Sequence, residues 1–254
     1  MKIIISPAKK MRIEPDSIPH CDMPAFLPQT EILFDVLRHM TPQELKSLWK
    51  CSDSIAALNF ERLQTMELRR GLTPAILAYE GLQYQHMAPG VFTNQEFSYI
   101  EEHLRILSGF YGLLRPLDGV IPYRLEMQAK LQTAYGADLY AFWGNRLARA
   151  LSEQTGCILN LASKEYSICI SKHLPDTVRF ITCVFGTEKD GKIVEKGTLC
   201  KMARGEMVRY LAENQITDPE HVKLFQGMGF HFDAARSTRE TFVFLHAPKT
   251  VPKA

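Results

Sequence analysis

The stretch HLRILSGFYGLLRPLD, residues 103–118, is the part of the chain on which the interpretation of the fold depends. It follows a capping box at Thr93–Glu96, a pattern typical of a helix start. Apolar residues then recur at helical spacing: Phe97, Ile100, Leu104 and Leu107. The pattern predicts a helix that ends in a tight turn over residues 108–112.

That turn has two competing interpretations. Gly109 and Gly112 permit positive φ and close backbone approach, so the N–H groups of Ser108–Gly112 can meet a phosphate, with Arg105 and Arg115 nearby to neutralise it. This is the logic of a helix-hairpin-helix DNA clamp. The alternative is a plain helix cap in which Arg115 pairs with Asp118. Spacing alone favours the cap, and both interpretations stay open.

The sequence on the N-terminal side predicts one strand followed mostly by helices. Residues 2–5 are β-branched and strand-like, residues 6–10 form a turn, and residues 11–28 hold four prolines and look irregular. An apolar stripe over 32–40 predicts a helix, a capping box at 41–44 opens a second, and Ser52 a third. Residues 75–79 look like a short buried strand that ends before Gly81.

On the C-terminal side, strands become frequent. After Gly144 we expect a helix ending at Gly156, a strand over 157–162, and strands over 178–185 and 193–200. Asp190-Gly191 between the last two is a hairpin signal. The G-x-x-x-x-G-K match at 186–192 lacks the Ser or Thr and the helix of a phosphate-binding loop, so the hairpin is preferred. A helix over 201–214, a short helix capped by Thr217 and a strand over 241–245 complete the pattern.

Composition indicates an ordinary folded protein. The 254 residues are 46% apolar and 23% charged, without internal repeats, a long linker or an apolar run long enough to span a membrane. We therefore predict a single mixed α+β domain over residues 1–246, a flexible tail over 247–254, a cytoplasmic location and no membrane partner. Oligomeric state is left open.

Bulk charge and cysteine spacing argue against two classes of protein. A net charge of +2 is too balanced to indicate a nucleic-acid-binding protein, so a basic site must come from local clustering. The six cysteines form no C-x-x-C, and no His lies at ligand spacing from them, which predicts no metal and no cofactor. Cys169, Cys183 and Cys200 stand in apolar surroundings and are expected to be buried thiols.

Two further motifs are basic. On a helix, Lys201, Arg204 and Arg209 fall within an arc of roughly 140°, which can face one anion or form a solvated stripe. Arg124 stands close to Glu126 in the segment 122–127.

Seven motifs together resemble the YaaA family of bacterial peroxide-stress proteins. They are ISPAK (5–9), AILAYEG (75–81), LSGFYGLLRPLD (107–118), PYRLEM (122–127), LYAFWG (139–144), LNLASKEY (159–166) and KMARGEM (201–207). The resemblance implies a mixed fold peculiar to this family, with a basic cleft and a helix-hairpin-helix-like element that binds duplex or branched DNA. It also implies a protein that limits damage by free iron.

The resemblance assigns the anion-binding role to particular side chains by motif. These are Lys9, Arg115, Arg124, Lys164, Lys201 and Arg204. Three positions depart from the family's pattern: Lys10 stands where Thr is usual, Met202 where a second Lys is usual, and His246 where Arg is usual.

Three functions compete at this point. The first is DNA binding through phosphate contacts, which carry little sequence information and depend strongly on salt. The second is an enzyme acting on a nucleotide or nucleobase bound in the same basic pocket, because carboxyl and phenol groups stand beside the basic motifs: Asp118, Glu126, Glu165, Tyr123 and Tyr166. The preferred interpretation of those carboxylates is that they orient Arg115, Arg124 and Lys164 through salt bridges. The third, direct iron chelation, lacks a ligand cluster in the sequence. A small deep pocket favours the enzyme, and a long open groove favours DNA.

Overall fold

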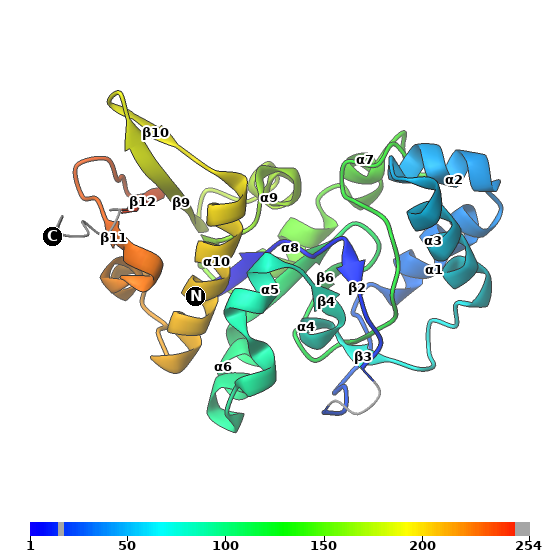
Figure 1. Cartoon of the computed structure of the whole chain (residues 1–254), viewed down its shortest axis with the longest axis horizontal. Helices are drawn as coiled ribbons and strands as arrows, with labels where there is room; N and C mark the ends of the chain where they lie inside the picture. The colour runs from blue at the N-terminus through cyan, green and yellow to red at the C-terminus, as the bar shows by residue number, and fades with distance from the viewer. Residues whose placement is uncertain (15–17, 247–254) are drawn as a thin grey trace, which may run out of the picture.

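A computed structural model describes residues 1–14 and 18–246 of the chain (Figure 1). At its centre is an eight-stranded sheet with the order β11-β12-β9-β8-β1-β5-β6, and β10 pairs with β9. The strands are β1 (Lys2–Ile5), β5 (Leu104–Ser108), β6 (Gly112–Leu114), β8 (Cys157–Asn160), β9 (Arg179–Lys189), β10 (Lys192–Val194), β11 (Phe230–Phe232) and β12 (Thr241–His246). Two short ribbons lie outside this sheet: β2 (Lys10–Met11) with β4 (Tyr79–Glu80), and β3 (Thr73–Pro74) with β7 (Gly119–Val120).

The middle of the large sheet is parallel. β1 pairs in parallel with β5 on one side and β8 on the other, and β9 pairs in parallel with β8 and β12. From β1 the chain first reaches β5 and later passes to β8 on the opposite side, so the strand order reverses at β1. In open sheets with parallel strands, ligands bind in the crevice outside the carboxyl ends of the strands at such a reversal.

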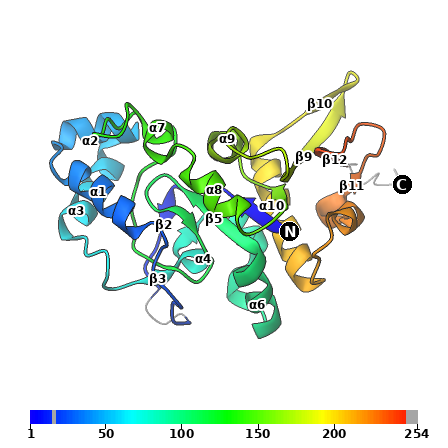
Figure 2. The same cartoon turned by 180° about the vertical axis from the view of Figure 1, so that it is seen from behind.

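Helices cover both faces of the sheet. α5 (Leu82–Met87), α6 (Asn94–His103) and α10 (Gly197–Glu213) lie on one face, and α8 (Arg146–Ser152) with α9 (Lys164–Ser171) lies on the other (Figures 1 and 2). α1 (Leu27–Arg38), α2 (Pro42–Trp49), α3 (Asp53–Thr65) and α7 (Leu139–Trp143) gather beyond the β6 edge (Figure 1). The remaining helical segments are α4 (Ala75–Ala78) and the 3-10 turns Pro89–Val91, Pro219–Leu224 and Gly227–Gly229.

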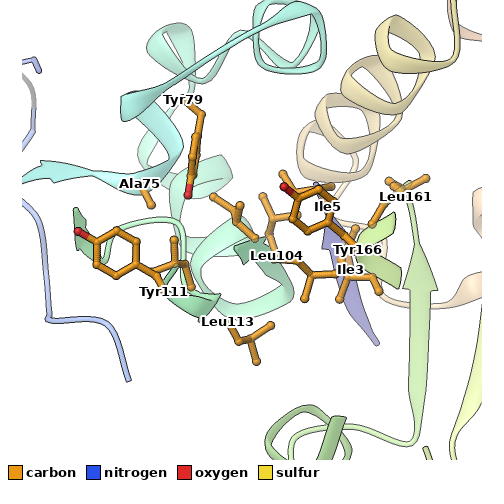
Figure 3. Close-up of a cluster of buried hydrophobic side chains, with 14 of the residues drawn as sticks. Ile3, Ile5, Ala75, Tyr79, Leu104, Tyr111, Leu113, Leu161 and Tyr166 are labelled. Carbon is orange, nitrogen blue, oxygen red and sulfur yellow. The ribbon is translucent and has the colours of Figure 1, made fainter. Parts of the chain in front are cut away.

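The core lies around β1, whose Ile3, Ile4 and Ile5 are completely buried. Figure 3 shows Ile3 and Ile5 packed among side chains that other segments contribute, Leu104 from β5 and Leu161 after β8 among them. A parallel strand covered by helices on both faces has a continuous apolar sequence instead of an alternating one. Burial on both faces therefore explains the unbroken Ile3–Ile5 run.

Most sequence-based expectations for the fold are confirmed. The chain forms one mixed helix/strand domain, the capping boxes at Thr41 and Thr93 open α2 and α6, and Asp190-Gly191 turns the β9–β10 hairpin. Cys169, Cys183 and Cys200 are buried. The predicted tail, residues 247–254, lies outside the described residues.

The predicted helix beyond residue 103 is wrong. α6 ends at His103, and Leu104–Ser108 form β5, every residue of which is buried. A strand that is buried on both faces can have apolar residues at every position, so its sequence also matches helical spacing. This is why Leu104 and Leu107 fit a helical pattern. The turn over residues 108–112 therefore joins two antiparallel strands, β5 and β6, and no helix-hairpin-helix element surrounds it.

Two other expected strands are also corrected. Ala75–Ala78 form the single helical turn α4, which is buried throughout, and of the predicted strand only Tyr79 pairs, with Met11. The strand predicted over 193–200 ends at Val194, and α10 begins at Gly197 instead of residue 201. The apolar residues Leu199 and Cys200 face the core from the first turn of that helix.

Candidate functional site

A pocket of about 360 Å³ lies at the carboxyl ends of β1 and β8, where the strand order reverses. Ser6–Lys10 leave β1 along one wall, Ser163 and Glu165 enter from the start of α9, and Lys201 and Arg204 reach it from α10. The hydroxyl of Ser6 donates to the Ser163 hydroxyl (3.2 Å) and accepts from the Ser163 backbone N–H (2.8 Å). These bonds fix the end of β1 against the N-terminus of α9.

Four of the basic residues selected from the sequence meet in this pocket. They are Lys9, Arg124, Lys201 and Arg204, which come from three segments far apart in the chain. Lys9 and Lys201 are exposed, whereas the side chains of Arg124 and Arg204 are only 10% and 15% exposed. The lysines therefore form the rim of the pocket, and the arginines lie deeper.

Carboxylates balance part of this charge. Glu126 accepts from Lys9 Nζ at 2.7 Å and from Arg124 Nη2 at 3.3 Å, so one carboxylate holds both cations. At the rim, Lys10 pairs with Glu80 across the β2–β4 ribbon at 3.0 Å. The pocket is consequently of mixed charge instead of uniformly basic.

Three deep donors in this pocket have no acceptor. Within residues 1–14 and 18–246, four buried side-chain nitrogens lack a hydrogen-bond partner, and three belong to pocket residues: Gln83 Nε2, Arg124 Nε and Arg204 Nε. A buried polar group without a partner costs about 1–3 kcal/mol of stability. The pocket therefore concentrates donors that a bound acceptor would satisfy.

A chain of hydroxyl groups runs behind the pocket. Ser108 Oγ accepts from the N–H groups of Phe110 (3.1 Å) and Tyr111 (2.8 Å), which leaves its hydrogen for the Tyr123 hydroxyl at 2.7 Å. Tyr123 also bonds to the Tyr79 hydroxyl at 2.9 Å. Burial raises the pKa of Tyr123 to about 12, so the phenol stays protonated at neutral pH and is available as a donor.

One pocket carboxyl has a shifted pKa. Burial raises the pKa of Glu165 above its ordinary value, and the nearby Glu126 carboxylate adds to the increase. The Gln128 N–H donates to Glu165 at 3.3 Å and opposes the shift. Burial therefore favours the protonated form of Glu165 more than it would that of an exposed carboxyl.

The residues around the 108–112 turn lie elsewhere. Arg105 is buried, and its guanidinium donates to Gln154 Oε1 and to the backbone carbonyls of Glu101 and Leu104. Ser108 is completely buried beneath Tyr123. These two side chains hold β5 in place and do not line the pocket.

The two glycines of this turn differ. Gly112 has a φ of 75°, in agreement with the expectation of positive φ. Gly109 instead packs tightly, because a Cβ there would lie 2.6 Å from the carbonyl oxygen of Leu125. The close backbone approach at Gly109 is thus made to the chain itself, next to the segment that carries Arg124 and Glu126.

Three other predicted cations are also outside the pocket. Arg115 pairs with Asp118 (3.2 Å) and Asp22 (2.7 Å), as in the helix-cap alternative, although a strand precedes it. Arg209 pairs with Glu213 on the surface of α10 at 2.7 Å. Lys164 lines a different depression, together with Asp138 and Lys172.

Sequence reasoning missed several pocket residues. Ser6 and Ser163 follow the carboxyl ends of parallel strands, and polar residues in that position are a usable signal. Gln83 lies on α5 with no local pattern that distinguishes it from a surface glutamine. Its place in the pocket comes from the packing of α5 against α10.

Two other features are absent from the part of the chain that the structure describes. Among residues 1–14 and 18–246, no group of three or more His, Cys, Asp or Glu side chains is arranged to hold a metal ion. In the same part of the chain, no helix combines the length and apolar character needed to cross a bilayer.

The chain matches known proteins along nearly its whole length, including the segments that form the pocket. A family model described as peroxide stress protein YaaA matches residues 1–236. A UPF0246 protein of Lachnoclostridium phytofermentans is 51% identical over 251 residues, 99% of this chain and 98% of the relative. A UPF0246 protein of Lactiplantibacillus plantarum is 51% identical over 246 residues, 97% of this chain and 99% of the relative. All residues that line the pocket fall inside the family-model match.

Proposed function

Because the chain belongs to the family of peroxide stress protein YaaA, we propose that it acts in the response to peroxide by binding DNA. The partner is duplex or branched DNA, held through phosphate groups with little sequence specificity. The observation that carries this proposal is the convergence of Lys9, Arg124, Lys201 and Arg204 on one pocket. Lys and Arg contacts to phosphate position a protein on DNA without reading its bases.

The same binding would limit damage by free iron. DNA phosphates hold an atmosphere of cations, and a protein that neutralises phosphates with Lys and Arg releases them. Iron(II) is one such cation, and it reacts with peroxide where it is held. A protein bound to DNA phosphates therefore lowers the amount of iron next to the bases.

The test is the affinity for closed circular duplex DNA as a function of salt. We expect affinity to fall steeply with salt, and Lys9→Ala and Lys201→Ala each to reduce the slope of log affinity against log salt by about 0.9. Arg149→Ala is the matched control, because Arg149 is an exposed cation on α8 outside the pocket. Slopes that stay equal in all four proteins would refute phosphate binding at the rim.

An enzyme acting on a nucleotide or nucleobase in the same pocket is the second candidate. It is favoured by the small volume of the pocket, about 360 Å³, and by Glu165, whose pKa is raised by burial and which shares the pocket with Tyr123. The exposed lysines at the rim, Lys9 and Lys201, favour DNA instead. If this candidate is correct, Glu165→Gln abolishes turnover of a nucleotide while DNA affinity changes less than threefold. This candidate is contradicted if the wild type shows no detectable turnover and Glu165→Gln lowers the affinity for DNA.

A further inference from the structure

The deep part of the pocket has more hydrogen-bond donors than its own acceptors satisfy. Gln83 Nε2, Arg124 Nε and Arg204 Nε come from three different segments and are buried without partners in the described chain. All three residues line the same pocket. Natural proteins pair most buried polar groups, so several unpaired donors around one cavity indicate a ligand with several acceptor atoms.

The Tyr123 hydroxyl adds a fourth donor. It accepts the Ser108 hydrogen, and when Tyr79 donates to it as well, both lone pairs of Tyr123 are occupied. Its own hydrogen is then left for an acceptor in the pocket, which Tyr123 lines. This group supplies a neutral donor beside two guanidinium groups.

The net charge of the side chains that line the pocket favours some oxyanions over others. Five cationic side chains (Lys9, Lys10, Arg124, Lys201 and Arg204) and three carboxyl side chains (Glu80, Glu126 and Glu165) line the pocket, an excess of two positive charges when all are ionised. A phosphate monoester carries about −1.5 to −2 at neutral pH and has three terminal acceptor oxygens. A diester inside a DNA strand has one charge and two such oxygens, and a carboxylate has one charge.

We infer that the deep part of the pocket binds a phosphate monoester, carried by a nucleotide or by the end of a DNA strand, through Gln83, Arg124 and Arg204. The volume of about 360 Å³ is within the range of small-ligand sites, about 300–1,000 Å³. The rim lysines remain free to contact the neighbouring phosphates of a strand. This inference rests on the proposed function for the phosphate chemistry, and adds that the pocket distinguishes an end from an interior phosphate.

The experiment measures binding of the full-length protein to matched probes. They are a single-stranded oligonucleotide with a 5′-phosphate, the same strand with a 5′-hydroxyl, thymidine 5′-monophosphate, thymidine, and closed circular duplex, which has no ends. We expect the 5′-phosphate to improve strand affinity at least tenfold, and thymidine 5′-monophosphate, but not thymidine, to compete. The relative affinities of the mononucleotide and the phosphorylated strand identify the source of the monoester.

Two variants connect the effect to the unpaired donors. Gln83→Leu removes one donor at similar volume, and Arg204→Lys keeps the charge but removes the guanidinium Nε. Each is expected to reduce the advantage of the 5′-phosphate to less than threefold, with Arg149→Ala again as the unchanged control. Thermal unfolding of each variant is measured to check that it is folded.

The outcomes separate this inference from the proposed function. Equal affinity for the 5′-phosphate and 5′-hydroxyl strands overturns the inference, even if circular duplex binds with the expected salt dependence. Binding of the monoester without any binding of circular duplex overturns the proposed DNA function and leaves the inference standing. A 5′-phosphate advantage that persists in both Gln83→Leu and Arg204→Lys also overturns it.

Discussion

Gly205 of α10 faces the backbone carbonyl oxygen of Gln83 in α5 so closely that a methyl group at residue 205 would overlap that oxygen. α5 and α10 are packed extensively along this contact, and each helix contributes to the pocket. Their separation determines how far Gln83 lies from Arg204. The absence of a side chain at residue 205 is therefore a condition for the geometry of the site.

Gly205→Ala tests this contact. Helix propensity alone predicts a gain of about 1 kcal/mol for Ala over Gly, whereas the overlap predicts a loss of about 3 kcal/mol from overpacking. We expect the loss, measured as the free energy of unfolding in urea. Gly197→Ala is the control in the same helix, because a Cβ there meets nothing within 4 Å. A stabilised Gly205→Ala protein would contradict the packing described.

Gly109→Ala tests the close approach beneath the hydroxyl chain. The added Cβ would lie 2.6 Å from Leu125 O and 3.0 Å from Glu126 C, so the segment that carries Glu126 must shift. We expect a loss of about 2 kcal/mol in the free energy of unfolding. Gly156→Ala, where a Cβ meets nothing within 4 Å, should be close to neutral. Equal stability of the two variants would show that the 125–127 segment tolerates displacement.

Asp118 makes stability depend on pH in an unusual direction. Burial raises its pKa from 3.8 to about 6, although hydrogen bonds from Arg115 oppose the increase. The folded state then binds more protons than the unfolded chain between about pH 4 and 6, so this group lowers the free energy of unfolding as pH rises through that window. The expected contribution is about 3 kcal/mol.

Comparison with Asp118→Asn isolates this contribution. The variant keeps the shape of the side chain but cannot ionise, so the stability difference between wild type and variant should change through about pH 4–6 and level off on either side. Urea unfolding of both proteins at a series of pH values measures it. Parallel stability curves would mean that Asp118 titrates at its ordinary pKa in the folded protein.

Tyr123→Phe tests the buried hydroxyl chain. Without the phenol oxygen, the Ser108 hydroxyl loses its acceptor and the Tyr79 hydroxyl loses its hydrogen-bond partner, and both groups are buried. We expect a loss of about 2 kcal/mol in the free energy of unfolding. Tyr135→Phe, at a tyrosine that is 56% exposed, should change stability by less than about 0.5 kcal/mol.

Capping and turn motifs correctly predicted the elements whose ends depend on side chains a few residues away. The capping boxes at Thr41 and Thr93 satisfy backbone N–H groups within the first turn, so α2 and α6 begin where the sequence predicted. The Asp190-Gly191 turn has positive φ at both residues, as a tight hairpin requires. Leu104–Ser108 could not be recognised as a strand from periodicity, because its partners are β1 and β6 and it is buried on both faces.

The site was only partly predictable for a similar reason. Motifs identified Lys9, Arg124, Lys201 and Arg204, but nothing local showed that they converge. Convergence depends on β1 pairing with β8, and on the contact between α5 and α10. Gln83 is the clearest case, since its role follows entirely from a helix that packs against it from the other half of the chain.

The position of β1 in the sheet also has a consequence for synthesis. β1 is made well before β8, yet its register with β8 joins Lys2 to Ile158 and Ile4 to Asn160. A ribosome adds about 5–20 residues each second, so roughly 8–30 seconds pass between the synthesis of β1 and that of β8. During that interval the edge of Ile3–Ile5 that later pairs with β8 has no partner strand. Pairing with β5 or binding to a chaperone must then protect this apolar segment from aggregation.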